Sequence, residues 1–303
     1  MEQTFYSNGK LLISSEYLVL DGAKALALPT KFGQNLIVEE GKNKEIVWKS
    51  FDKDNSIWFN ETLLFSEIIE KKTFESQTEK NTLIAILHEA FLLNPNYINL
   101  SEGYNVTTQL TFPKFWGLGT SSTLINNIAQ WIKIDAFTLL KNSFGGSGYD
   151  IACAQNNTPI LYQLVNGKPI VASVVFNPSF TNQLYFVYLN KKQSSKNAIA
   201  SYYKKQNDIF PFITKINTIT NTILHSKEIE SFISEIENHE IILSEILETK
   251  TVKETLFSDF SGTIKSLGAW GGDFVLAVSK ENPSAYFKEK GFETILTYEE
   301  MIL

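Results

Sequence analysis

The chain has 303 residues, of which 43% are hydrophobic and 20% charged, and its formal net charge is −6. This composition is typical of a globular protein with one large or two medium domains. The acidic balance argues against nucleic acid as a partner, and no apolar run is long enough to span a bilayer. Cys153 is the only cysteine. With neither an intrachain disulfide nor a signal peptide, we expect a cytoplasmic protein.

Hydrophobic periodicity predicts strands and helices interspersed along the chain. We expect strands at 34–39, 45–49, 106–111, 184–189 and 274–278, a strand and turn at 11–20, and a strand pair at 159–165 and 170–176. Helices are expected at 80–93, after residue 122, and over most of 196–248, with 229–247 amphipathic and a break near Pro211. The pattern predicts an α+β protein of two domains, 1–180 and 181–303.

A glycine-rich loop at 113–122 reads Pro-Lys-Phe-Trp-Gly-Leu-Gly-Thr-Ser-Ser and runs directly into a helical pattern. Unpaired backbone N–H groups and the dipole at a helix N-terminus favour an anion such as a phosphate. Glycine lets the backbone approach a ligand closely, and hydroxyls add donors or a metal-facing oxygen. The alternative is ordinary helix capping by Ser or Thr. On the loop alone, the two interpretations are evenly matched.

Three further segments carry glycine or charged residues, and with the loop counted as the second they are numbered in chain order. The first segment, 9–17, reads Gly-Lys-Leu-Leu-Ile-Ser-Ser-Glu-Tyr. The third segment, 146–150, reads Gly-Ser-Gly-Tyr-Asp, and the fourth segment, 265–273, reads Lys-Ser-Leu-Gly-Ala-Trp-Gly-Gly-Asp. Each is weak by itself, because glycine clusters are common in turns.

In this order, the four stretches resemble the GHMP kinase superfamily, which includes galactokinase, homoserine kinase, mevalonate kinase and phosphomevalonate kinase. The resemblance covers nearly the whole chain, and the Pro-x-x-x-Gly-Leu-Gly-Ser/Thr-Ser loop is its most specific part. It implies an N-terminal domain like domain 2 of ribosomal protein S5 and a C-terminal ferredoxin-like domain. It also implies ATP and Mg²⁺ as cofactors and a small-molecule acceptor.

Matched position by position, the resemblance assigns roles to individual residues. It implies nucleotide contacts from Gly117, Leu118, Gly119, Thr120, Ser121, Ser122, Gly268, Ala269, Gly271 and Gly272. Thr120 or Ser121 would face Mg²⁺, and we take Ser121 as the expected metal ligand.

Asp150 is the implied catalytic carboxylate, and Lys10 is the implied cation near the transferring phosphoryl group. Phosphoryl transfer relies on donors, cations and alignment around the γ-phosphoryl oxygens. With an alcohol acceptor, Asp150 would take or orient its proton; with a phosphate acceptor, it would mainly pair with Lys10. The alternative role of Asp150 is to cap the helix that follows.

The first, third and fourth segments look most like those of phosphomevalonate kinases, so we expect phosphomevalonate or mevalonate as acceptor. The expected acceptor contacts are Glu16, Tyr17, Gly148, Tyr149, Ser194 and Lys196. The basic run at 191–196 has a plainer alternative as a solvated turn. We expect a monomer or homodimer without a membrane or nucleic acid partner.

The chain departs from the superfamily pattern at Ser15 and Trp270, where the pattern has Gly. Trp270 is expected to narrow the pocket or move the loop. Mevalonate kinases carry a Mg²⁺-binding Glu before the catalytic Asp, whereas the only acid here between Trp131 and Tyr149 is Asp135. These departures motivate a second hypothesis, a GHMP-fold binding or regulatory protein without catalysis.

Other enzymes fit less well. A diphosphomevalonate decarboxylase is a further alternative within the superfamily. A serine hydrolase would need Gly-x-Ser-x-Gly, which the run at 145–149 misses by ending in Tyr149. The Gly-x-Gly-x-x-Gly pattern of dinucleotide-binding enzymes does not occur in the sequence.

Overall fold

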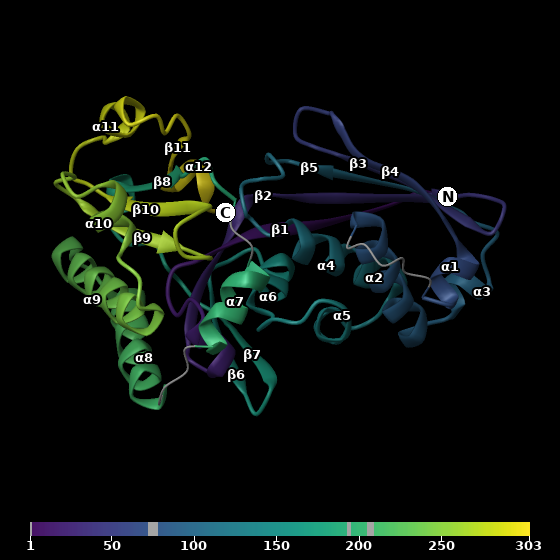
Figure 1. Cartoon of the computed structure of the whole chain (residues 1–303), viewed down its shortest axis with the longest axis horizontal. Helices are drawn as coiled ribbons and strands as arrows, with labels where there is room; N and C mark the ends of the chain where they lie inside the picture. Colours follow the sequence, from purple (N-terminus) through teal and green to yellow (C-terminus); the bar gives the residue numbers. More distant parts are fainter. Residues whose placement is uncertain (1, 72–77, 193–194, 205–208) are drawn as a thin grey trace. The chain divides into compact units, whose positions relative to one another are not determined.

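The computed structural model describes residues 2–71, 78–192, 195–204 and 209–303 (Figure 1). Its residues pack into two compact units. Unit 1 comprises Met1–Gly9, Phe32–Lys114 and Gly119–Gln155; unit 2 comprises Lys10–Lys31, Phe115–Leu118 and Asn156–Leu303. The chain therefore passes between the units several times, and the glycine-rich loop contributes to both. The predicted boundary at residue 180 stays a prediction.

Unit 1 is a sheet covered by helices. Strand β3 (Glu45–Phe51) pairs antiparallel with β4 (Ile57–Leu64) and parallel with β5 (Tyr104–Leu110). Strand β5 pairs antiparallel with 34–40 of the long strand β2 (Ala25–Glu40), and β1 (Gln3–Leu12) also pairs with β2. The helices are α1 (Phe65–Ile69), α2 (Glu79–Leu93), α3 (Asn96–Asn99), α4 (Thr120–Ile132), α5 (Ala136–Ser143) and α6 (Tyr149–Gln155). Apolar side chains of the sheet and helices share one core, including Trp48, Leu87 and Ile128.

Helix α4 buries a polar side as well as its predicted apolar side. Asn126 Nδ2 donates to Ser7 Oγ at 2.8 Å, and Ser7 Oγ donates to Asn127 Oδ1 at 2.7 Å. Asn127 Nδ2 donates to the carbonyl oxygen of Gln34, also at 2.8 Å. Because buried polar groups are costly unless paired, this network fixes α4 against β1 and β2.

Unit 2 contains a four-stranded antiparallel sheet in the order β11-β8-β10-β9. Its strands are β8 (Leu184–Tyr188), β9 (Thr263–Leu267), β10 (Phe274–Val278) and β11 (Ile295–Thr297). Helices lie between β8 and β9 and between β10 and β11, which with this strand order is the ferredoxin-like arrangement predicted for the C-terminal half.

The remaining elements of unit 2 surround that sheet or form a hairpin. The helices are α7 (Ser195–Lys204), α8 (Phe210–His225), α9 (Ile229–Leu247), α10 (Val252–Leu256), α11 (Ser284–Glu289) and α12 (Tyr298–Met301), with 3-10 turns at Leu18–Asp21 and Thr181–Gln183. Helix α9 packs against α8 and β9. The hairpin of β6 (Ile160–Val165) and β7 (Lys168–Ser173) pairs with 25–27 of β2. None of the described helices has the length and apolar composition needed to cross a membrane.

Most local predictions are confirmed. The predicted strands at 34–39, 45–49, 106–111, 184–189 and 274–278, the hairpin about Asn166-Gly167 and the helices at 80–93 and 229–247 are all present, with small differences at their ends. The predicted interruption near Pro211 is confirmed, because α7 ends at Lys204 and α8 begins at Phe210; Pro211 stands in the first turn of α8, where its missing N–H costs nothing. Strands β4, β9 and β11 were not predicted, and β1 begins well before residue 11.

Replacing Leu276 at the centre of the unit 2 sheet tests where the core lies. Its side chain is 1% exposed on β10, so Leu276→Ala should lower the free energy of unfolding by about 2–5 kcal/mol. Leu256→Ala is the matched control, because that side chain is 45% exposed on α10, and it should change the value by less than about 0.5 kcal/mol. Urea unfolding followed by circular dichroism gives both values; equal effects would contradict the assignment.

Candidate active site

Two residues of the glycine-rich loop, Phe115 and Trp116, contact the sheet of unit 2 just before the first glycine of the loop. The Trp116 ring lies edge-on to the Phe274 ring at 5.4 Å between centroids, and 6.3 Å from the Tyr188 ring. The Tyr188 hydroxyl donates to the carbonyl oxygen of Phe115 at 3.0 Å. Since Tyr188 ends β8 and Phe274 begins β10, the ferredoxin-like sheet positions this end of the loop.

The next two residues of the loop contact the first and fourth segments. The Lys10 N–H donates to the carbonyl oxygen of Leu118 at 3.0 Å. Gly117 has φ of 70°, and a β-carbon there would overlap the carboxylate of Asp273. The loop thus requires glycine at position 117 for two reasons, its backbone conformation and the adjacent acid.

Helix α4 begins without a side-chain cap from any residue that the structure describes. Its N-cap is Gly119, with φ of 99°. Ser122 Oγ donates to the carbonyl oxygen of Gly119 at 2.9 Å, a bond to a carbonyl that satisfies none of the first N–H groups. Thr120 is half-buried and Ser121 exposed. The capping alternative therefore loses its basis, while the binding of phosphate at the first amides of α4 stays a prediction.

The third segment leads into helix α6, which packs against α4 within unit 1. Asp150 is half-buried in the first turn of α6, and its Oδ1 accepts a hydrogen bond from the Ile151 N–H at 3.1 Å. Gly148 is buried with φ of 89°, and Tyr149 is half-buried. The structure thus places the third segment beside the helix that the loop begins, while the catalytic role of Asp150 stays a prediction.

The first segment shows why the superfamily pattern has Gly at position 15. Ser15 has φ of 70°, a left-handed conformation that is unfavourable for a residue with a side chain. Hydrogen bonds hold it there: its N–H donates to His239 Nε2 at 2.8 Å, and its hydroxyl donates to the carbonyl oxygen of Lys24. Ser15 is therefore an anchored replacement for glycine and leaves the turn intact.

Glu16 belongs to a buried charged cluster, which we call the Lys265 cluster (Glu16, His239, Glu240 and Lys265). Lys265 Nζ donates to Glu16 Oε1 at 2.7 Å and lies 3.4 Å from Glu240 Oε1. Lys265 is 0% exposed and Glu16 2%. Because removing one partner of a buried pair leaves an uncompensated charge, these groups stabilise one another. The predicted contact of Glu16 with the acceptor stays a prediction; here its carboxylate is directed at Lys265.

His239 is the neutral member of this cluster. Burial and, to a smaller extent, the charge of Lys265 lower the pKa of His239 to about 3, against a still smaller raising effect of Glu16. Because Nε2 accepts from the Ser15 N–H, the ring proton is on Nδ1. Nε2 also lies 3.4 Å from Glu16 Oε2, which finds no donor among the described residues. Burial raises the pKa of Glu240. The charge of Lys265 and the hydrogen bond from the Ser266 N–H act in the opposite direction but do not cancel this rise.

The fourth segment is tied to Tyr17 through Trp270. The Trp270 N–H donates to the Tyr17 hydroxyl at 2.9 Å, and its indole N–H donates to the carbonyl oxygen of Lys250 at 3.1 Å. The ring packs against Tyr17, Tyr202 and Leu247. Gly268 and Gly271 have φ of 77° and 81°, so both need glycine. The large side chain that replaces a superfamily glycine is thus accommodated in an aromatic cluster.

The predicted site residues fall into two groups. Unit 2 brings together residues 10–17 of the first segment, residues 115–118 of the loop and the fourth segment, whereas unit 1 holds Thr120, Ser121, Ser122 and the third segment. Ser194 and the side chain of Lys196 lie outside the described residues.

The sequence analysis missed His239, Glu240, Lys265 and Asp273. One signal was available. A carboxylate at position 16 in an apolar stretch needs a buried cation, and Lys265, the first residue of the fourth segment, is the only charged residue between 260 and 272.

Mg²⁺ is implied by the predicted activity, and the oxygen atoms at the loop suit it. Among the described residues, no group of three or more His, Cys, Asp or Glu could hold a metal. Mg²⁺ usually keeps several waters and binds one or two protein oxygens together with substrate phosphates. The exposed Ser121 hydroxyl, in the first turn of α4, is a donor of that kind.

Comparison with known proteins identifies the fold. No protein-family model and no curated protein matches the sequence. Among solved structures, a phosphomevalonate kinase of Streptococcus pneumoniae, solved with phosphomevalonate and AMPPNP, is 15% identical, with a TM-score of 0.71 over 97% of this chain and 99% of that chain. The mevalonate kinase of Methanococcus jannaschii is 15% identical, with a TM-score of 0.70 over 98% and 96%. A galactokinase of Lactococcus lactis, complexed with galactose, is 11% identical, with a TM-score of 0.68 over 98% and 92%.

These likenesses extend over almost the entire chain, so it has the two-domain GHMP kinase fold. The predicted resemblance and the α+β fold class, with an N-terminal S5-like and a C-terminal ferredoxin-like domain, are confirmed at the level of fold.

The lowered pKa of His239 predicts how the free energy of unfolding changes with pH. Its pKa in the folded protein is about 3 against an ordinary 6.5, so below pH 6.5 the unfolded chain binds a proton that the folded chain refuses. The free energy of unfolding therefore falls with pH, and the His239 contribution to it drops by about 2 kcal/mol between pH 7 and pH 5. The raised pKa of Glu240 acts in the opposite direction, so a comparison of variants is needed to isolate the histidine.

His239→Gln keeps an acceptor for the Ser15 N–H and removes the titration. Its free energy of unfolding relative to wild type should rise by about 2 kcal/mol on going from pH 7 to pH 5. His225→Gln, at an exposed position at the end of α8, is the control and should follow wild type. Denaturant unfolding at both pH values measures the difference; parallel profiles for His239→Gln and wild type would contradict the assignment.

Proposed function

We propose that the chain is an ATP-dependent small-molecule kinase that transfers the γ-phosphoryl group to phosphomevalonate or mevalonate. The observation that carries this proposal is the start of α4, where glycine replaces a side-chain cap and the preceding loop is fastened by a tryptophan and an acid. Such a helix start combines oriented N–H groups with a fixed backbone, which is what a phosphate site needs. A similar fold solved with AMPPNP supports a nucleotide as the ligand.

In this proposal, Gly117, Leu118, Gly119, Thr120, Ser121 and Ser122 surround the ATP phosphates, and Gly268, Ala269, Gly271 and Gly272 close over the nucleotide. Lys10 supplies positive charge to the transferring group. Its position is fixed by its own backbone bond to Leu118. Mg²⁺, when bound, offsets phosphate charge and aligns the phosphates, with Ser121 as its ligand from the loop.

Asp150 acts on the acceptor. For the hydroxyl of mevalonate, its carboxylate would accept the proton as the oxygen attacks. For the ionised phosphate of phosphomevalonate, it would orient Lys10 and the acceptor without removing a proton. Its place in the first turn of α6, which packs on α4, keeps it in a defined position relative to the start of α4.

The acceptor is proposed from the first, third and fourth segments, with Glu16, Tyr17, Gly148, Tyr149, Ser194 and Lys196 as its contacts. Proteins of similar fold include one solved with phosphomevalonate and one with galactose, so the fold alone leaves the acceptor open. We further propose that the enzyme works in the cytoplasm as a monomer or homodimer.

One observation favours a second candidate, a nucleotide-binding protein without catalysis. The backbone N–H of Trp270 donates to the Tyr17 hydroxyl, and that of Asp273 donates to the carbonyl oxygen of Lys191. Two amides of the fourth segment are therefore engaged within the protein. Measuring ADP release with ATP, Mg²⁺ and mevalonate, phosphomevalonate, homoserine or galactose separates the candidates. Turnover with phosphomevalonate or mevalonate alone supports the kinase; nucleotide binding without turnover on any acceptor supports the second candidate.

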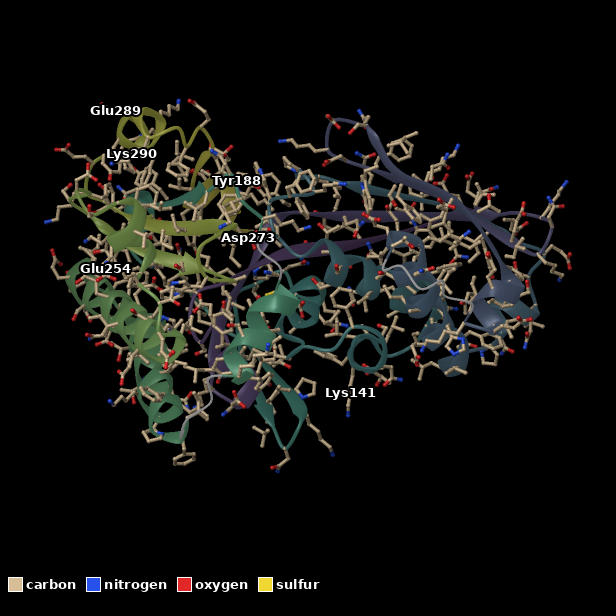
Figure 2. All side chains as sticks on the ribbon, viewed as in Figure 1. Lys141, Tyr188, Glu254, Asp273, Glu289 and Lys290 are labelled. Atoms are coloured by element: carbon tan, nitrogen blue, oxygen red, sulfur yellow. The ribbon has the colours of Figure 1, made fainter. Side chains whose placement is uncertain are left out.

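The catalytic assignments predict the behaviour of two variants. Lys10→Ala and Asp150→Asn should each reduce kcat by at least about a hundredfold, because each removes a group that acts on the transferring phosphoryl or the acceptor. Lys141→Ala, at an exposed position on α5, is the matched lysine control and should keep wild-type turnover (Figure 2). Steady-state kinetics, with circular dichroism to verify folding, give the comparison. Near-normal kcat in both site variants would refute the assignments.

A further inference from the structure

Asp273 is an acid held in a fixed position at the end of the fourth segment. It is 7% exposed, and its φ is 53°. Its N–H donates to the carbonyl oxygen of Lys191 at 2.7 Å, and its own carbonyl oxygen accepts from the Leu189 N–H at 2.8 Å. These two bonds leave the backbone of Asp273 little freedom, so its carboxylate has a defined place.

That place is against the glycine-rich loop. A β-carbon on Gly117 would overlap the carboxylate carbon and both carboxylate oxygens of Asp273, so the acid lies directly on the backbone at the first glycine. The charge of Asp273 also acts on the hydroxyls of Tyr17 and Tyr188. Burial raises the pKa of each hydroxyl, and the negative charge of Asp273 raises it further. Figure 2 labels Asp273 and Tyr188 on neighbouring parts of the unit 2 sheet.

Shape alone does not require an acid at this position. Asparagine has nearly the same size as aspartate and adopts positive φ at least as readily. A negative charge beside a loop that binds phosphate disfavours a bare anion, and a partly buried setting strengthens that repulsion. The carboxylate at this position therefore affects which form of a phosphate ligand the loop favours.

We propose that Asp273 makes the loop selective for a nucleoside triphosphate that carries Mg²⁺ over the free anion. This inference rests on the proposed function, since it assumes that nucleotide phosphates occupy the loop. The carboxylate repels an uncomplexed triphosphate and attracts the divalent cation, so both effects act in the same direction.

The test is the affinity of the intact protein for a fluorescent ATP analogue, with Mg²⁺ or with EDTA at equal ionic strength. The quantity compared is the dissociation constant measured with EDTA divided by the dissociation constant measured with Mg²⁺. Asp273→Asn keeps the shape and removes the charge, and it should lower this ratio about tenfold, mainly by tightening binding of the free nucleotide. Asp273→Gly suits the positive φ, removes the side chain altogether, and should lower the ratio similarly.

Glu289→Gln is the control, because it makes the same change in net charge at an exposed position at the end of α11, away from Asp273 (Figure 2). Its ratio should equal that of wild type. If both Asp273 variants bind nucleotide with an unchanged ratio, the inference is wrong while the proposed function stands. If wild type binds no nucleotide even with Mg²⁺, the proposed function fails and takes the inference with it.

Discussion

A lysine buried on the ferredoxin-like sheet joins stretches of unit 2 that are distant in sequence. Lys265 is 0% exposed in the middle of β9, and its ammonium group is neutralised by Glu16 and Glu240. Removing either the cation or its main partner would leave a buried charge unpaired, at a cost of about 3–5 kcal/mol. Because Glu16 belongs to the first segment and Lys265 to the fourth, the pair joins two stretches that are distant in sequence.

The glycine-rich loop depends on the same assembly. Tyr17, next to Glu16, binds the backbone of Trp270, and Asp273 closes the fourth segment against Gly117. Lys10 then bonds to the carbonyl oxygen of Leu118 from the strand that leads to Glu16. The start of the loop is therefore positioned by contacts that originate in the Lys265 cluster, while its continuation into α4 is held by the buried asparagine network of unit 1.

Two residues of the first segment have a strained backbone. Ser15 and Tyr17 both have positive φ, 70° and 64°, although neither is glycine. Such residues persist where the surroundings determine them, and Ser15 is held by His239 and Lys24. This explains how the chain departs from the superfamily pattern at position 15 without losing the turn. Trp270 is the second departure, and its ring gains packing against Tyr17 and Tyr202 where glycine would have none.

Local structure could be predicted from the sequence where one face of a helix is apolar, as in α9, or where a strand is a continuous apolar run, as in β10. Helix α4 shows the limit, because its buried Asn126 and Asn127 look like surface residues until their partner Ser7 is known. The loop itself was recognisable from its glycines and hydroxyls. The Lys265 cluster was not, since Glu16 and Lys265 are separated by 249 positions and no periodicity connects them. Strand β9 was missed because the charged side chain of Lys265 stands at its centre and interrupts the apolar pattern.

The most direct test of this account is a crystal structure with Mg²⁺ and a non-hydrolysable ATP analogue, because the central claim is that the loop entering α4 binds nucleotide phosphates. The account predicts that the β- and γ-phosphates lie within hydrogen-bonding distance of the backbone N–H groups of Thr120, Ser121 and Ser122, with Gly117 still packed against Asp273. A nucleotide bound elsewhere on the protein, with the start of α4 occupied only by water, would contradict it.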